Sequence, residues 1–174
     1  MFLASSEAKS RNELKWWFAA LAERIWLPDG AAGTILHYKE RRQMRELESY
    51  ARSILRIVVG LLFTCHGLQK LLGMFGGMGG KGAVAAFPSL FWWAAVLETA
   101  GGFLVVIGLF TRPTAFLLCG EMAVAYFRAH APRGAWPIQS GGEPAVLYCF
   151  VYLYLSASGP GPISVDRLMG RSKK

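Results

Sequence analysis

The residues best suited to chemistry are a histidine, a lysine and a glutamate inside long apolar segments. His66 and Lys70 are four residues apart and therefore share one face of a helix. Glu98 lies on the next apolar segment, within about one helical turn of His66 in depth if the two segments cross a membrane in opposite directions. We expect these three side chains to form a catalytic cluster that exchanges protons with a ligand. The interpretation that they only bond one another and fix helix packing stays open.

Four further residues are candidates for binding a cofactor or ligand. Glu121 falls near the midplane of a third apolar segment, His130 and Glu143 fall at the outer ends of the third and fourth segments, and Trp136 lies between them. Together with the first cluster they would line a polar path from the outer surface toward the middle of the membrane. The aromatic run Tyr148, Phe150, Tyr152 and Tyr154 is typical of lipid-facing or packing residues, but an aromatic-walled slot is also what a quinone would need as a cofactor; no cofactor signature is evident in the sequence. We predict no metal site, because the ligand-type residues lack a tight spacing such as H-x-x-x-H.

Three cysteines are spread over different apolar segments and form no C-x-x-C motif. Cys65 and Cys149 fall at similar depths, so a bridge between them is one interpretation. The other is that both are small buried hydrophobic side chains.

The elements that must position these residues read as membrane helices. Apolar residues make up 53% of the 174 residues and charged residues 17%, more apolar and less charged than an average soluble domain. We predict an all-α protein, an integral membrane four-helix bundle with spans at 54–72, 90–110, 113–130 and 143–158. The first two can cross a hydrocarbon core of about 30 Å, whereas the last two need tilt or local thinning of the bilayer.

An N-terminal extension precedes the predicted bundle. Residues 13–27 have the apolar spacing of an amphipathic helix, which would lie in the membrane interface or pack on a partner protein. Residues 34–52 read as a charged helix that runs into the first span. We therefore divide the chain into a cytoplasmic helical extension (1–51), a four-span membrane domain (52–168) and a basic tail (169–174). The N-terminus does not read as a signal peptide.

The net charge of +8 is spread along the chain rather than gathered in one patch, which argues against nucleic-acid binding. Lysine and arginine outside the spans, with Arg56 and Arg128 near span ends counted among them, are distributed fifteen to three if both termini lie on the same side. Because positive residues favour the cytoplasmic side, we predict a multi-pass protein of the cell (inner) membrane with both termini in the cytoplasm.

Several short motifs occur in an order that resembles the DoxX family of small four-helix membrane proteins. They cover about residues 52–168 and comprise His66-Gly67-x-x-Lys70, Glu98-x-x-Gly101-Gly102, Gly108-Leu109-x-Thr111, Met122-x-x-Ala125, Gly142-Glu143 and Gly159-Pro160-Gly161 with Ser164 and Asp166. The resemblance implies a four-helix membrane fold and a link to thiosulfate:quinone oxidoreductase and terminal oxidase complexes. It also makes His66, Lys70, Glu98, His130 and Glu143 the polar positions of the family, whereas Glu121 rests on its predicted depth alone.

Two functions remain open, and with them the question of whether the chain is an enzyme. The first is an accessory subunit of a quinone-linked membrane redox system, in which a partner subunit supplies the electron carrier. The second is a non-enzymatic assembly, cargo or scaffold protein whose N-terminal extension recruits a cytoplasmic partner. A homo-oligomer fits either function, and a small-solute transporter is disfavoured because no internal repeat is visible.

Overall fold

A computed structural model describes the backbone of residues 31–171 and the side chains of residues 37–171. The predicted amphipathic helix at 13–27 lies outside the described residues, as do the last three residues of the basic tail. Within the described range the chain is helical, with one isolated β-bridge between Met78 and Ala83. The all-α prediction is therefore confirmed.

The longest helix, α2, runs from Ala31 to Leu72 and confirms that the charged segment continues into the first apolar segment. The chain divides into two compact units, Met1–Arg45 and Glu46–Lys174. In the first unit, the described side chains at 37–45 are all exposed, and His37 Nδ1 lies 3.7 Å from Glu40 Oε2.

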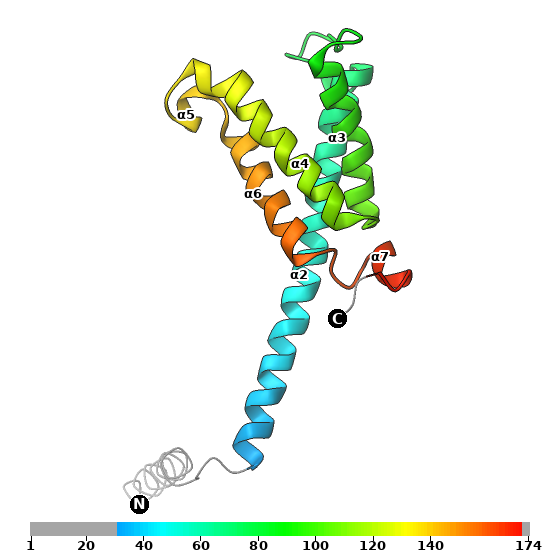
Figure 1. Cartoon of the computed structure of the whole chain (residues 1–174), viewed down its shortest axis with the longest axis vertical. Coiled ribbons are helices and arrows are strands. Elements are labelled where there is room, and N and C mark those ends of the chain that lie inside the picture. The colour runs from blue at the N-terminus through cyan, green and yellow to red at the C-terminus, as the bar shows by residue number, and fades with distance from the viewer. Residues whose placement is uncertain (1–30, 172–174) are drawn as a thin grey trace, which may run out of the picture. The chain divides into compact units, whose positions relative to one another are not determined.

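The second unit contains three more long helices, which Figure 1 labels: α3 (Leu90–Ile107), α4 (Thr111–Ala125) and α6 (Glu143–Ser158). The bounds of α6 coincide with the predicted segment, whereas α3 ends three residues early because Gly108 turns the chain with a φ of 70°. The remaining elements are short: η1 (Met74–Gly76), the π-helical η2 (Tyr126–His130), η3 (Ala131–Arg133), α5 (Pro137–Ser140) and α7 (Val165–Leu168).

Helices α2 and α3 run side by side and touch through glycines (Figure 1). A Cβ atom on Gly60 would lie 2.9 Å from the Gly102 carbonyl oxygen, and one on Gly102 would lie 2.7 Å from the Thr64 backbone nitrogen. Gly101 faces Leu118 of α4 instead. A different helix therefore approaches α3 closely at each of these two glycines.

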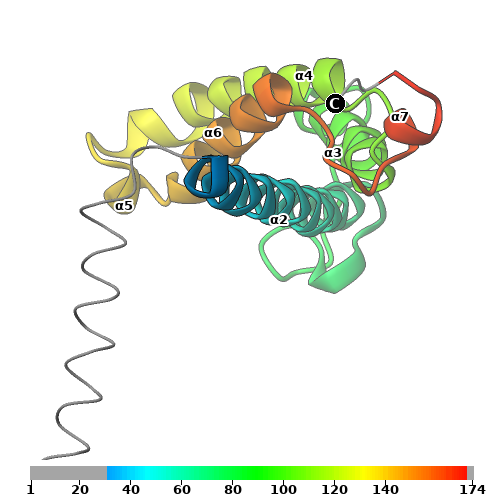
Figure 2. The same cartoon turned by 90° about the horizontal axis from the view of Figure 1, so that it is seen from below.

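Helices α4 and α6 pack along each other, as the view from below in Figure 2 shows. Leu118 and Met122 of α4 and Tyr152 and Leu155 of α6 are buried in the hydrophobic core. Phe63 of α2 joins this core with its ring centroid 5.0 Å from that of Tyr152. The core therefore lies where α2, α4 and α6 meet.

On α3, large apolar side chains are exposed and a carboxylate is buried, which is the opposite of the usual pattern on a helix of a soluble protein. On α3 the buried residues include Ala95, Glu98 and Gly102, whereas Phe91 and Phe103 are exposed. Two helical segments, His37–Leu72 and Leu90–Ile107, are long and apolar enough to cross a membrane. Helices α4 and α6, with 15 and 16 residues, are shorter.

A network of hydrogen bonds closes one end of this unit around Arg56. The guanidinium is fully buried and donates to the carbonyl oxygens of Val105 and Val106 at the end of α3, and to those of Pro160 and Ile163 in the C-terminal segment. The sequence had placed Arg56 among the cytoplasmic charges outside the spans, whereas it holds the ends of α3 and α6 together from inside.

Asp166 closes the same end from the other side. Its carboxylate accepts hydrogen bonds of 2.9 Å from the backbone nitrogens of Phe110 and Thr111, where α4 begins. Backbone N–H groups at the start of a helix lack partners within the helix, so this carboxylate caps α4.

Candidate functional site

A cavity of about 800 Å³ opens between α2, α3, α4, α6 and the turns that follow α4. Five of the seven predicted site residues line it: His66, Lys70, Glu98, Glu121 and His130. Arg128, two helical turns beyond Glu121, also lines it. The predicted convergence of polar side chains from separate helices is therefore present.

Glu98 is the most deeply buried charged residue of the cavity, with 2% of its surface exposed. Lys70 Nζ donates a hydrogen bond to Glu98 Oε1, and the two groups form an ion pair. Glu98 Oε2 is buried and has no hydrogen-bond partner in the described part of the chain. A buried carboxylate oxygen without a donor is costly, so this atom is a ready acceptor for a ligand that enters the cavity.

Glu121 supplies a second carboxylate to the same cavity. Both of its oxygens are buried, and neither has a hydrogen-bond partner among residues 37–171. Two lining residues of the cavity therefore carry three buried carboxylate oxygens that lack a donor in the described part of the chain.

His66 lies on the cavity wall but does not supply the hydrogen bond to Glu98, which comes from Lys70. Its ring meets the ring of Tyr148 edge-on with 6.0 Å between centroids. Tyr148 in turn stacks on Tyr152 at 6.1 Å, and Phe63 contacts both tyrosines. Aromatic rings thus connect the histidine to the core and hold the imidazole at the cavity.

His130 is the last residue of the π-helical turn η2, and its Nδ1 lies 3.2 Å from the Ser140 carbonyl oxygen. The structure does not bring Glu143 and Trp136 to the cavity. Both are exposed, Trp136 with 67% of its surface, and neither is among the lining residues. Trp136 lies between η3 and α5 in the connection 131–142, and Glu143 follows this connection at the start of α6; the conformation of the connection was not predicted.

The remaining lining residues, among them Trp93 and Arg133, were not among the predicted site residues. Trp93 lies one helical turn before Leu97 on the cavity wall, and Arg133 ends η3. The position of Trp93, five residues before Glu98, carried a weak signal, since both residues belong to the first half of the same span. Arg133 carried none, because its position depends on the unpredicted turn.

The structure does not contain the Cys65–Cys149 bridge that was one of the two interpretations of the cysteines. Cys149 Sγ lies 3.6 Å from Cys119 Sγ, so its neighbour is on α4 and not Cys65 on α2. Depth alone had suggested Cys65, whereas the close packing of α4 on α6 decides the contact. All three cysteines are free thiols.

Comparison with known proteins places this geometry in context. The sequence profile of the DoxX family matches residues 51–131. A Haemophilus influenzae protein whose name assigns no function is 45% identical over 130 residues, which cover 71% of this chain and 96% of that protein.

Two further relatives are 27% identical to this chain. "Putative oxidoreductase CatD" of Bacillus subtilis matches over 70% of this chain and 88% of its own length. "Inner membrane protein YqjF" of Escherichia coli matches over 74% of this chain and 98% of its own length. No solved structure matches the chain.

Proposed function

Because this chain belongs to the DoxX family of membrane proteins, we propose that it is an accessory subunit of a quinone-linked redox system in the cell membrane and that its cavity holds the quinone head group. The observation that carries the proposal is the state of Glu98, a lining residue of the cavity whose Oε1 is paired with Lys70 and whose Oε2 is buried without a donor among the described residues. The oxidoreductase name of the Bacillus subtilis relative points in the same direction.

The cavity suits a ligand with a polar head and an apolar body. Its volume of about 800 Å³ falls in the range of about 300–1,000 Å³ that is usual for small-molecule sites. Apolar and aromatic side chains, among them Phe91, Trp93 and Leu117, form much of its wall. The carboxylates of Glu98 and Glu121 give it a few convergent polar groups.

The residues of the chain would handle the protons that accompany quinone chemistry. Glu98 Oε2 would accept a hydrogen bond from a hydroquinone hydroxyl and take its proton, while Lys70 keeps the carboxylate oriented through Oε1. Glu121 or His66 would take the second proton. The two electrons would pass to an acceptor in a partner subunit, and the reverse reaction uses the same groups in the opposite order.

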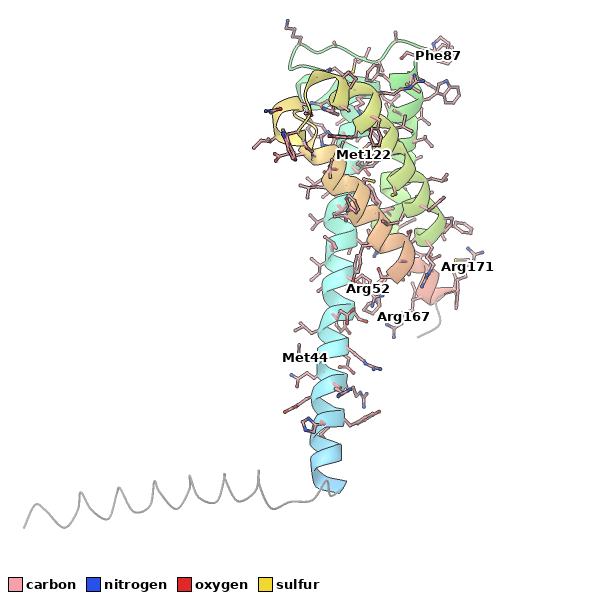
Figure 3. All side chains as sticks on the ribbon, turned by 60° about the vertical axis from the view of Figure 1, so that its left-hand side comes forward. Met44, Arg52, Phe87, Met122, Arg167 and Arg171 are labelled. Atoms are coloured by element: carbon pink, nitrogen blue, oxygen red, sulfur yellow. The ribbon has the colours of Figure 1, made fainter. Side chains whose placement is uncertain are left out.

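The proposal includes four membrane spans with both termini in the cytoplasm. Helix α4 continues through the five residues of η2, and the combined length of about 30 Å matches a hydrocarbon core. Figure 3 shows Arg52, Arg167 and Arg171 toward one end of the second unit and Phe87 at the other. An arginine-rich end favours the cytoplasmic side, and the Escherichia coli relative is named an inner membrane protein.

Binding of a short-chain ubiquinone, decylubiquinone, tests the cavity directly. The purified protein in detergent should show quenching of tryptophan fluorescence, and Trp93→Phe should remove much of this quenching because Trp93 lines the cavity. Trp136→Phe is the matched control, since Trp136 is exposed and outside the lining.

Substitution of Glu98 and of Glu143 tells binding in the cavity from binding at the surface. Glu98→Gln should weaken binding of the reduced ligand, decylubiquinol, at least about tenfold, since a hydrogen bond to a charged group contributes about 1.5–3 kcal/mol. Glu143→Gln should leave the affinity unchanged, because Glu143 is exposed and does not line the cavity. Equal effects of the two substitutions, or no binding by the unaltered protein, would refute the proposal.

One observation favours the second function, recruitment of a cytoplasmic partner. The described side chains at 37–45, several of them charged, are all exposed within their unit. Deletion of residues 1–45 would separate the two functions: quinone binding should survive it, whereas a scaffold role should not.

A further inference from the structure

Two thiols on neighbouring helices lie close enough to react with each other. Cys119 on α4 and Cys149 on α6 have their sulfur atoms 3.6 Å apart, and both residues are partly exposed. The third cysteine, Cys65 on α2, has no such neighbour among the described cysteines. The structure thus separates one pair of thiols from an isolated thiol in the same chain.

The distance permits a disulfide after a small movement. A disulfide bond is about 2.05 Å long, so the two sulfur atoms must approach each other by about 1.5 Å. Rotation of the side chains and a slight shift between α4 and α6 can supply this movement. The partial exposure of both residues leaves an approach for a reagent that is dissolved in the lipid.

The pair lies next to the cavity but is not part of it. Cys119 is three residues from Met122 and Cys149 is four residues from Ala145, and Met122 and Ala145 both line the cavity. Residues three or four apart are neighbours on a helix surface, so the thiols lie about one turn from the cavity wall. A bond between them would join the two helices that form this wall.

We propose that Cys119 and Cys149 are a reversible dithiol–disulfide site whose oxidant is a lipid-soluble quinone. In the oxidation, the two S–H bonds break and one S–S bond forms. The thiols lose two electrons and two protons, and the quinone takes up both and leaves as a hydroquinone. The proposal goes beyond the quinone cavity and does not depend on it.

Counting free thiols in the full-length protein tests this site without any substitution. The protein is reduced, placed in phosphatidylcholine vesicles, freed of reductant and incubated with decylubiquinone without oxygen. It is then unfolded, alkylated with N-ethylmaleimide and analysed by peptide mass spectrometry. The expected result is the loss of two of the three alkylated thiols, with Cys65 still alkylated and one hydroquinone formed per disulfide. Three alkylated thiols after incubation would overturn the proposal.

Variants and a reagent control make the result specific. After incubation with decylubiquinone, Cys65→Ser should have neither of its two remaining thiols, Cys119 and Cys149, alkylated. Cys119→Ser should have both Cys65 and Cys149 alkylated, because Cys149 then has no partner. Incubation with decylubiquinol, which cannot accept electrons, should leave every thiol free. Loss of Cys65 in the unaltered protein, or of thiols in Cys119→Ser, would show unspecific oxidation and refute the site. The thiol count is read independently of the tryptophan quenching that tests the cavity, so the two proposals can fail separately.

Discussion

A Cβ atom on Gly67 would lie 2.2 Å from Thr99 Oγ1 and 2.5 Å from the Thr99 backbone nitrogen. Helices α2 and α3 therefore touch at this position with no room for a side chain. Gly67→Ala should lower the free energy of unfolding by about 1–3 kcal/mol, the usual effect of overpacking, because backbone atoms cannot move aside as a flexible side chain can. Thermal unfolding in one detergent measures the effect. Gly120→Ala, where an added Cβ meets nothing within 4 Å, should unfold like the unaltered protein.

The ion pair between Lys70 and Glu98 leads to a second prediction. Lys70→Met would leave the buried Glu98 carboxylate without its cation and should cost about 3 kcal/mol of stability. The double variant Lys70→Met/Glu98→Gln should be more stable than Lys70→Met alone, because the uncompensated charge is removed. A double-mutant cycle by thermal or denaturant unfolding checks this, and additive effects of the two substitutions would contradict it.

Arg56 leads to a third prediction, on the structural role of a buried charge. Arg56→Met would leave four backbone carbonyl oxygens without their donor and should destabilise the protein by about 3 kcal/mol or more. Arg112→Met is the control: Arg112 is exposed and donates to the Ala157 carbonyl oxygen at 2.8 Å, so its loss should cost about 1 kcal/mol or less. Equal unfolding temperatures for the two variants would show that the Arg56 network contributes no stability.

The helices and the cavity could be predicted because they depend on spacing within single helices. Apolar length placed α3 and α6 to within a few residues, and the rise per residue brought Lys70 and Glu98 to one depth. The depth argument also placed Glu121 in the cavity. The same reasoning could not predict whether His66 or Lys70 donates the hydrogen bond to Glu98, because both residues share a helix face. The longer side chain of Lys70 makes the bond.

Contacts that depend on packing between helices could not be predicted. The predicted spans give Cys65 and Cys149 similar depths, but the pairing of α4 with α6 makes Cys119 the neighbour of Cys149. Trp136 and Glu143, whose sequence positions suggested the outer rim of the cavity, are absent from its lining, whereas Arg133 and Pro144 belong to it. The acceptors of Arg56 are backbone carbonyls, which no pattern of side chains reveals.

The order of synthesis gives the Arg56 network a consequence for biogenesis. Arg56 and the end of α3 leave the ribosome early, but Pro160 and Ile163, two of the four acceptors, and Asp166, the cap of α4, are made near the end. In the proposed topology, the first two helices therefore enter the bilayer before the Arg56 guanidinium has all of its hydrogen-bond acceptors. The bundle can lock only after the final stretch has folded back, so a truncation shortly before residue 160 should yield helices that insert but do not assemble.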